Sequence, residues 1–395
     1  SEPNMTSSNL NIVHFLLLIT PLLGPAIVMR SAPSLNETFQ HILFISIAAF
    51  FVTIWLIPII ARYTVKNGMY GMDINKKGTP GGEVKIPESL GIACGIVYLT
   101  AGVIGQFWYA NQDKKLLEYN AALLCICFMI LLGFVDDALD IPWRYKLILP
   151  TVASLPLLIV YANGGGITYV KLPQYVVSLF PSILSTELEL GSLYYIYMLL
   201  VLVFCCNAIN IHAGINGLEA GQSYIIGVAI MIHNIIEAGE DSQGRSQHIL
   251  SLFLVGPFVG TTAGLLVHNF YPSSVFVGDT YTMFAGMCLA VCGIMGHFSK
   301  TLMLFFIPQI LNFLYSVPQL FGLWGYHCPR HRLPKYNIND KLLYGVDGYL
   351  NLVNLGLHIF GPMTERNLCI VQLVFQSICC LLGLYIRYNM AALLY

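Results

Sequence analysis

The chain has 395 residues, of which 56% are hydrophobic and only 10% are charged, and its formal net charge at pH 7 is -1. Ordinary globular proteins carry about 25% charged residues, so this chain has too few charges to build the usual water-soluble surface. The near-neutral charge also argues against the basic patch or stripe that nucleic-acid binding requires, so we expect a membrane protein with no nucleic-acid partner.

About ten apolar stretches are long enough to cross the hydrocarbon core of a bilayer as α-helices, which takes about 20 residues. They cover roughly 41–62, 89–108, 120–135, 145–161, 191–207, 219–236, 248–268, 280–297, 301–322 and 368–388. The sequence therefore predicts an all-α, polytopic transmembrane helical bundle over residues 41–395. A further apolar stretch, 11–29, is interrupted by two prolines and a glycine, so residues 1–40 are expected to form an N-terminal extension whose topology stays open.

Successive spans alternate in direction, which divides the connecting loops into two sets. Twelve of the 19 Lys and Arg residues fall in one set, and the positive-inside rule places that set in the cytosol. The segments richest in Asp, Asn, Gly and His belong to the same set, namely 71–89, 136–146, 207–221, 269–280 and 327–335. We therefore expect an active site built from cytoplasmic loops, to which the long loop 323–367 contributes.

Two adjacent carboxylates, Asp136 and Asp137, follow directly on the third apolar stretch. Charges at a membrane edge are costly unless a cation compensates them, so this pair is a candidate for binding Mg²⁺ or for proton transfer. Lys146, at the start of the next stretch, is a candidate for holding an anionic headgroup. The alternatives are an interfacial helix cap for the two aspartates and, for Lys146, a lysine that simply extends to the membrane surface.

Segment 207–221 joins two apolar stretches through closely spaced glycines and asparagines. Glycine lets the backbone approach a ligand closely, and asparagine offers amide donors and acceptors without adding charge, so this turn suits a nucleotide base and a metal-bound diphosphate. Asp279, just before the eighth stretch, could share an octahedral Mg²⁺ with Asn210 and substrate phosphates. Read alone, the segment 278–280 is an ordinary helix start.

A short basic cluster, Arg330-His331-Arg332, lies between Pro329 and Pro334. The planar guanidinium group of arginine can donate two hydrogen bonds to phosphate oxygens, and the flanking prolines limit the entropy lost in placing the arginine side chains. A solvated basic patch beside the membrane is the alternative interpretation.

Taken together, these motifs resemble those of the polyprenyl-phosphate sugar-1-phosphate transferase superfamily, and in particular its eukaryotic members. The resemblance runs from about residue 43 to 390. The segments that carry it are 86–89 (IPES), 133–137 (GFVDD), 143–146 (WRYK), 207–210 (NAIN), 213–221 (AGINGLEAG), 276–280 (FVGDT) and 329–334 (PRHRLP). Three positions depart from the pattern, since Met72, His212 and Asp140 stand where other members have Gln, Leu and Asn.

The resemblance implies transfer of N-acetylglucosamine 1-phosphate from UDP-N-acetylglucosamine to dolichyl phosphate in the endoplasmic reticulum membrane. The products would be dolichyl diphosphate N-acetylglucosamine and UMP, the first step of lipid-linked oligosaccharide synthesis for protein N-glycosylation. Mg²⁺ is the implied cofactor, the surrounding membrane lipid is an implied partner, and the oligomeric state is left open, with a homodimer as one alternative.

The resemblance also implies roles for the matching residues. The metal ligands would be Asn210 and Asp279, and the catalytic residues Asp136, Asp137 and Lys146. Met72, Asp73 and Ile74 would line the nucleotide of the donor, and Glu88 would bind its ribose. Gly214 and Asn216 would bind the uracil, and Phe276 would lie against the face of the uracil ring. The diphosphate and the sugar would be bound by Arg330, His331 and Arg332. The lipid phosphate would be received by Lys146 and by Val203, Phe204, Cys205, Cys206, Asn207, Ala208, Ile209, Asn210 and Ile211.

The expected chemistry is in-line attack of the lipid phosphate on the β-phosphorus of the donor, in which positioning and charge neutralisation matter most. Asp136 or Asp137 could act as a base, orient Lys146 or form a covalent intermediate, and the sequence leaves these alternatives open. It also leaves open an epimeric donor, UDP-N-acetylgalactosamine. The main alternative from another class is a transporter or lipid flippase, whose site would lie in broken helices near the bilayer midplane rather than in loops and span ends.

Overall fold

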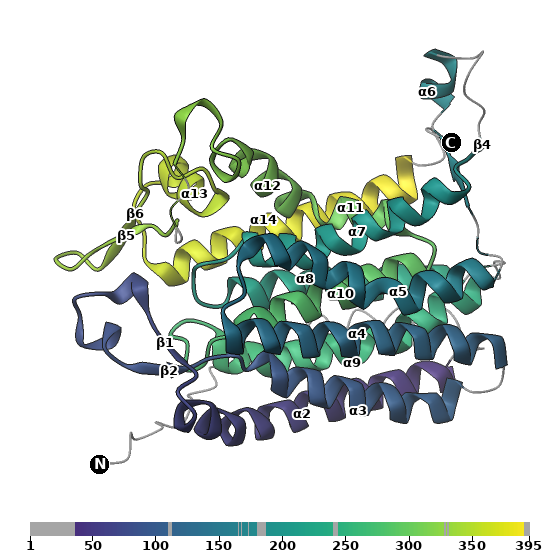
Figure 1. Cartoon of the computed structure of the whole chain (residues 1–395), viewed down its shortest axis with the longest axis horizontal. Helices are drawn as coiled ribbons and strands as arrows, with labels where there is room; N and C mark the ends of the chain where they lie inside the picture. The colour runs from purple at the N-terminus through teal and green to yellow at the C-terminus, as the bar shows by residue number, and fades with distance from the viewer. Residues whose placement is uncertain are drawn as a thin grey trace.

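The structure is a computed structural model that describes residues 36–109, 113–164, 166, 168–172, 174–179, 187–239, 244–327, 329 and 332–390. Helices run side by side and form a bundle (Figure 1). They are α2 (Asn36–Lys66), α3 (Gly91–Tyr109), α4 (Asp113–Leu139), α5 (Ile148–Asn163), α7 (Ser192–Ile211), α8 (Leu218–Gly239), α9 (Arg245–Asn269), α10 (Gly278–Met295), α11 (Ser299–Phe305), α12 (Ile307–Leu320) and α14 (Glu365–Tyr385). The predicted polytopic helical bundle is confirmed.

Eight of the described helices are long and apolar enough to cross a membrane, and the pair α11 and α12, bent by 70°, makes a ninth if it is a single span. The predicted span 219–236 corresponds to α8, which does not meet this test of length and composition. It carries buried polar side chains, including Gln222, His233 and Asn234, and packs against α9 and α14 inside the bundle. The apolar stretch 11–29 lies outside the described residues.

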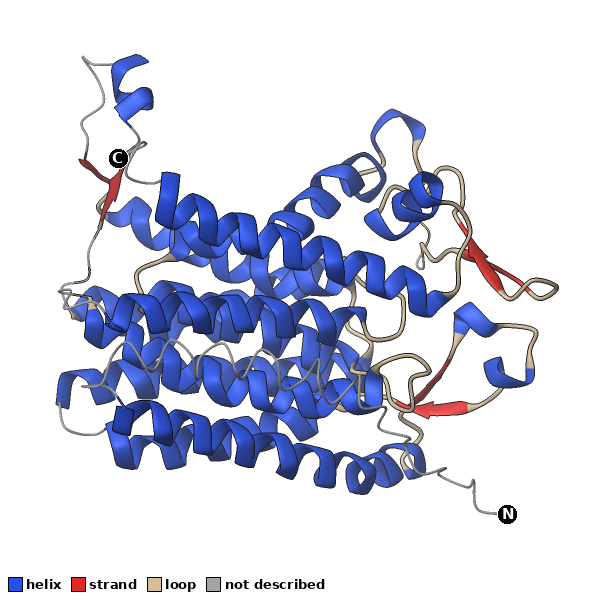
Figure 2. Ribbon diagram, turned by 180° about the vertical axis from the view of Figure 1, so that it is seen from behind, coloured by secondary structure: helices blue, strands red, loops and turns tan. Residues whose placement is uncertain are grey.

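The remaining elements are short and lie at the two ends of the bundle. They are β1 (Tyr70–Met72), β2 (Lys85–Pro87), β3 (Tyr169–Lys171), β4 (Glu187–Glu189), β5 (Lys335–Asn337), β6 (Leu342–Tyr344), α6 (Gln174–Leu179), α13 (Leu352–Phe360) and single turns at Ile74–Lys76, Pro80–Gly82, Trp143–Leu147, Leu323–Gly325 and Ile386–Met390. The strands form three antiparallel pairs, with Gly71 opposite Ile86, Val170 opposite Leu188 and Tyr336 opposite Leu343. The β1–β2 and β5–β6 pairs share one end, while β4 and α6 lie at the other (Figures 1 and 2).

The core is centred on α10, whose side chains from Thr280 to Met295 are all buried. Helices α4, α7 and α9 pack around it. The outer helices instead expose large apolar side chains, such as Phe44 and Trp55 on α2 and Leu381 on α14. Such a surface would be costly in water and is the surface that lipid chains cover.

Helices α2 and α9 approach each other closely because glycines recur at every fourth residue of α9. A Cβ atom on Gly260 would lie 2.2 Å from the carbonyl oxygen of Ser46, and Gly256 and Gly264 face α2 in the same way. Small residues at this spacing let helix backbones pack directly in membranes. The contact positions the start of the chain's first described helix against the buried α9.

We expect Gly260→Ala to force these two helices apart and to lower the melting temperature of the detergent-solubilised protein, since overpacking costs about 1–3 kcal/mol. Gly227→Ala in α8 is the matched control, because a Cβ there would meet only side-chain atoms of Val259 and Phe258, at 3.0 to 3.2 Å. Those side chains can shift, whereas the Ser46 backbone cannot. Equal melting temperatures for the two variants would contradict this account.

Candidate active site

A cavity of about 520 Å³ is lined in part by Gly71 and Met72 of β1, and β1 and β2 lie at one end of the bundle (Figure 1). It is lined by segments that are far apart in the sequence: 71–75, 88, 210–219, 269, 276–282, 332–333 and 351. The predicted site residues found in its wall are Met72, Asp73, Ile74, Glu88, Asn210, Ile211, Gly214, Asn216, Phe276, Asp279 and Arg332. Arg330 and His331 lie outside the described residues.

Asp279, in the first turn of α10, is the centre of one polar group in this cavity. Its Oδ1 accepts a hydrogen bond of 2.7 Å from Nδ2 of Asn210, and its Oδ2 forms an ion pair with Nζ of Lys146. The same Nζ lies 2.8 Å from Oδ2 of Asp136, whose side chain is buried. Lys146 therefore bridges two carboxylates, one from the end of α4 and one from the start of α10.

Asp137 caps the N-terminus of α10. Its carboxylate accepts hydrogen bonds from the backbone nitrogens of Asp279 (2.7 Å) and Thr280 (3.1 Å), and from the Thr280 hydroxyl. A negative charge at a helix N-terminus is favoured by the unpaired N–H groups and the helix dipole. The close approach of the Asp137 carboxylate to the start of α10 requires glycine at 278, since φ is +73° there and a Cβ would lie 2.4 Å from Oδ2 of Asp137. Asp137 thus holds Asp279 in place from outside the main cavity.

Asn210 and Asp279 offer the oxygen donors that a hard cation prefers. Because Nδ2 of Asn210 donates to Asp279, the amide oxygen of Asn210 is left for other partners. In the described part of the chain, no group of three or more His, Cys, Asp or Glu side chains could hold a metal ion. Mg²⁺ usually takes only one or two protein carboxylates and completes its shell with water and phosphate oxygens. The pair therefore fits a cation that arrives with a phosphorylated ligand.

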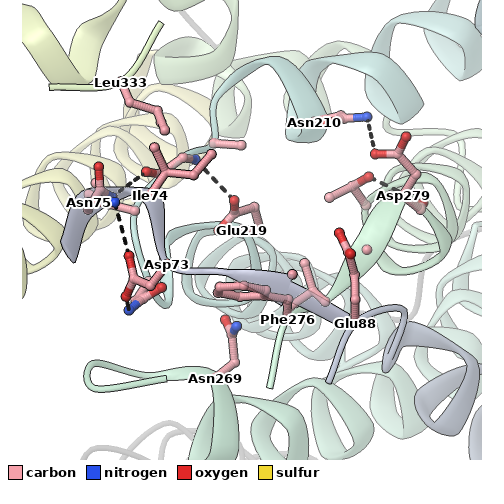
Figure 3. A pocket seen from close by; sticks show the side chains of 18 of the residues that line it. Asp73, Ile74, Asn75, Glu88, Asn210, Glu219, Asn269, Phe276, Asp279 and Leu333 are labelled. Carbon is pink, nitrogen blue, oxygen red and sulfur yellow. Dashed lines mark hydrogen bonds between the residues drawn. The ribbon is translucent and has the colours of Figure 1, made fainter. Parts of the chain in front are cut away.

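A second polar group lies across the cavity from the first (Figure 3). It contains Asp73 and Asn75 from the segment after β1 and Asn216 from the turn between α7 and α8. The ring of Phe276 lies between the two groups and packs on Gly71, where a Cβ would be 3.0 Å from the ring. The cavity therefore offers a flat aromatic face between two groups of amide and carboxylate side chains, one around Asp73 and Asn216 and the other around Asn210 and Asp279.

Glu88 stands between this cavity and a smaller one of about 380 Å³ that Asn67, Tyr70 and Asp137 help to line. Burial raises the pKa of its carboxyl group above the ordinary value, and the nearby carboxylates of Asp137 and Asp279 raise it further. A cation bound near these three carboxylates would oppose that shift.

Arg332 is anchored by the loop that follows it. Its guanidinium donates to the carbonyl oxygen of Leu350 at 3.1 Å, and its own carbonyl oxygen accepts from Nδ2 of Asn351 (2.8 Å) and of Asn354 (3.1 Å). Arg332 and Leu333 reach the cavity wall from this loop.

The predicted lipid-phosphate segment on α7 is divided by the packing of the helix. The side chains of Cys205, Cys206, Ala208 and Ile209 are buried inside the protein, where α7 packs on α10, so a phosphate does not reach them in this arrangement. Val203, Phe204, Asn207, Asn210 and Ile211 keep partly accessible side chains. The partly accessible residues of the predicted segment therefore lie on one side of the helix.

Comparisons with known sequences identify relatives of this chain. The model of glycosyl transferase family 4 matches residues 119–297. The UDP-N-acetylglucosamine–dolichyl-phosphate N-acetylglucosaminephosphotransferase of Dictyostelium discoideum is 50% identical over 393 residues, which cover 93% of this chain and 94% of that protein. The chain therefore belongs to the family of UDP-N-acetylglucosamine–dolichyl-phosphate N-acetylglucosaminephosphotransferases.

Two further relatives carry the same name. The Schizosaccharomyces pombe protein is 38% identical, over 89% of this chain and 92% of its own length, and the Saccharomyces cerevisiae protein is 35% identical, over 88% and 91%. The resemblance stated from the motifs is therefore confirmed, and it extends well beyond the part of the chain that the family model covers.

The three departures from the family pattern occupy different environments. Met72 is exposed and lines the cavity, so it can meet a ligand there. His212 is buried just after α7, where burial lowers its pKa to about 4 and keeps the ring neutral at physiological pH. Asp140 is exposed at the end of α4 with φ at +51°.

The polar residues near the cavity that were not predicted from the sequence include Asn75, Glu219, Asn269 and Glu365. Glu219 accepts a hydrogen bond of 3.1 Å from the backbone nitrogen of Gly214. It belongs to the motif 213–221, so its position in the sequence already pointed to the site. Asn75 follows directly on the predicted segment 72–74. Glu365 has no such signal, because it lies 149 residues from the turn whose Asn216 it contacts.

Proposed function

We propose that this chain transfers N-acetylglucosamine 1-phosphate from UDP-N-acetylglucosamine to dolichyl phosphate, giving dolichyl diphosphate N-acetylglucosamine and UMP. The observation that carries the proposal is the cavity itself, which joins an amide-rich aromatic pocket to a carboxylate and lysine cluster at one end of an apolar bundle. The relatives that match almost the whole chain carry this activity in their names.

The two polar groups of the cavity support a placement of the two ends of the donor. The base lies against Phe276 and Asn216, and the diphosphate lies toward Asn210 and Asp279, with the ribose between them at Glu88. Aromatic faces and amide groups suit a planar base, and cationic and metal-binding groups suit phosphates. Arg332 and the neighbouring Arg330 and His331 meet the diphosphate and the sugar.

The acceptor oxygen attacks the β-phosphorus, the bond to the α-phosphate oxygen breaks, and UMP leaves. A phosphomonoester has a second pKa of about 6, so the acceptor is largely ionised at neutral pH and needs little help from a base. Lys146, placed between Asp136 and Asp279, aligns the acceptor phosphate. Asp136 and Asp137 act as positioning residues, for Lys146 and for Asp279 respectively.

Mg²⁺ is the proposed cofactor, and Asn210 and Asp279 would hold it together with donor phosphates. When bound, it neutralises charge on the diphosphate. The excess of basic residues in the loops at the cavity end supports an active site that faces the cytosol in the endoplasmic reticulum membrane.

The test is transfer of radiolabelled N-acetylglucosamine 1-phosphate to dolichyl phosphate by the purified full-length protein, with Mg²⁺ and with a chelator. We expect Mg²⁺-dependent formation of the labelled lipid and of UMP in equal amounts. UDP-N-acetylgalactosamine in place of the donor distinguishes the epimeric alternative. No labelled lipid from either donor, made by folded protein, would overturn the proposal.

A further inference from the structure

Asn216, in the wall of the donor cavity, is held at both its backbone and its side chain. Its backbone nitrogen donates to Oε1 of Glu365 at 2.8 Å, and its Nδ2 donates to Oδ2 of Asp73 at 3.1 Å. Both carboxylates are buried, and so is Asn216 itself. Few conformations are therefore open to this amide group.

The two carboxylates are fixed in turn by their neighbours. Asp73 accepts from Nζ of Lys76 at 2.6 Å and from the backbone nitrogen of Asn75 at 3.1 Å. The side chain of Asn75 then donates to Glu365 at 3.3 Å and to the carbonyl oxygen of Gly214 at 2.9 Å. This closed network joins the segment after β1, the turn before α8 and the first residue of α14. Loss of either carboxylate would leave buried donors unpaired.

The network dictates which end of the Asn216 amide can serve a ligand. An ionised carboxylate only accepts hydrogen bonds, so Nδ2 must face Asp73, and Oδ1 is the polar atom that remains. Among the described residues, no donor bonds that oxygen. Uracil carries an N–H donor at N3, which such an oxygen accepts, whereas the N3 of cytosine is itself an acceptor and would repel it.

We propose that Asp73 and Glu365 are positioning residues that present the amide oxygen of Asn216 to the base and thereby set the preference for uracil over cytosine nucleotides. The proposal rests on the proposed function, in which Asn216 meets the base of the donor. It assigns a role to Glu365, which reaches the site from the far side of the loop 323–364.

The experiment measures the dissociation constants of UMP and CMP for the full-length protein by titration calorimetry, and compares their ratio between variants. In Asp73→Ala the amide loses the partner that orients it, so we expect the preference for UMP to fall about tenfold or more, mainly through weaker UMP binding. Glu365→Ala should lower the ratio in the same direction, because the backbone of the turn is released. Glu365→Gln should retain most of the preference, since its amide oxygen still accepts from the nitrogen of Asn216.

Thr364→Ala is the matched control. Thr364 caps α14 by accepting from the backbone nitrogen of Asn367 at 3.3 Å, so this variant weakens the same helix end without removing a carboxylate. We expect its UMP-to-CMP ratio to equal that of the wild type. A ratio that falls as much in Thr364→Ala as in Glu365→Ala would show that only helix stability matters and would overturn the proposal.

Two further outcomes would overturn it: no discrimination between UMP and CMP by the wild type, or an unchanged ratio in both Asp73→Ala and Glu365→Ala. If Asp73→Ala does not fold, the pair Glu365→Gln and Glu365→Ala still decides, because the proposal requires the two to differ. Nucleotide binding is measured without turnover, so a wild type that prefers UMP yet transfers no sugar phosphate contradicts the proposed function and not this inference.

Discussion

Asp279→Ala is expected to lower the rate of N-acetylglucosamine 1-phosphate transfer by at least about 10³-fold, because one carboxylate serves several functions at once. Its oxygens accept from Asn210 and pair with Lys146, and they face the cavity where the diphosphate is proposed to lie. Removing them leaves Lys146 with one carboxylate and leaves the proposed cation with the Asn210 amide alone. The measurement is transfer of labelled sugar phosphate to dolichyl phosphate at saturating Mg²⁺.

Asp347→Ala is the control for this variant. Asp347 is a carboxylate of the loop 323–367, its side chain is fully exposed, and its Oδ1 lies 3.9 Å from Nε2 of His358. We expect it to keep wild-type turnover. Turnover near the wild-type level in Asp279→Ala would remove this residue from the metal site and from the mechanism.

Lys146→Met is expected to abolish most of the transfer activity and also to destabilise the protein. Asp136 is buried and its Oδ2 lies 2.8 Å from Nζ of Lys146, so loss of the lysine leaves a buried negative charge without its cation. Breaking a buried ion pair on one side costs about 3–5 kcal/mol, although the partial exposure of Lys146 reduces that figure here. We expect a fall in turnover of at least about 100-fold together with a lower melting temperature.

The double variant Lys146→Met with Asp136→Asn separates the two effects. Replacing the carboxylate by an amide removes the buried charge, so the melting temperature should recover in part. Activity should not recover, because the cation that aligns the acceptor phosphate is still missing. Recovery of transfer in the double variant would show that Lys146 acts only by neutralising Asp136, and its proposed contact with the acceptor would be wrong.

Much of the fold follows from the sequence because the bilayer imposes a simple rule. A span needs about 20 apolar residues in a helix, and the alternation of spans assigns each loop to a side. The bundle and the grouping of the polar loops at one end agree with this reasoning. The rule is weakest for α8, where Gln222, His233 and Asn234 are buried among other helices, so that neighbouring side chains rather than lipid satisfy them.

Asn210, Asn216, Phe276 and Asp279 were singled out from the motifs on which the resemblance rests, and all four line the cavity. The motifs do not say which way each side chain points. Asp136 and Asp137 are adjacent in sequence, yet one pairs with Lys146 and the other caps α10, because successive residues of a helix face different directions.

The sequence by itself determined that this protein is a polytopic bundle of a recognisable transferase family, with its polar loops on one side, because span length and motif order are local properties of the chain. Only the tertiary structure decided how the site is held together. The contacts that hold the walls of the site together, such as Glu365 with Asn216 and Lys146 with Asp279, join residues more than a hundred positions apart in the sequence. Such contacts depend on how helices pack around α10, where glycines such as Gly278 permit the close approach, and no local pattern in the sequence encodes that arrangement.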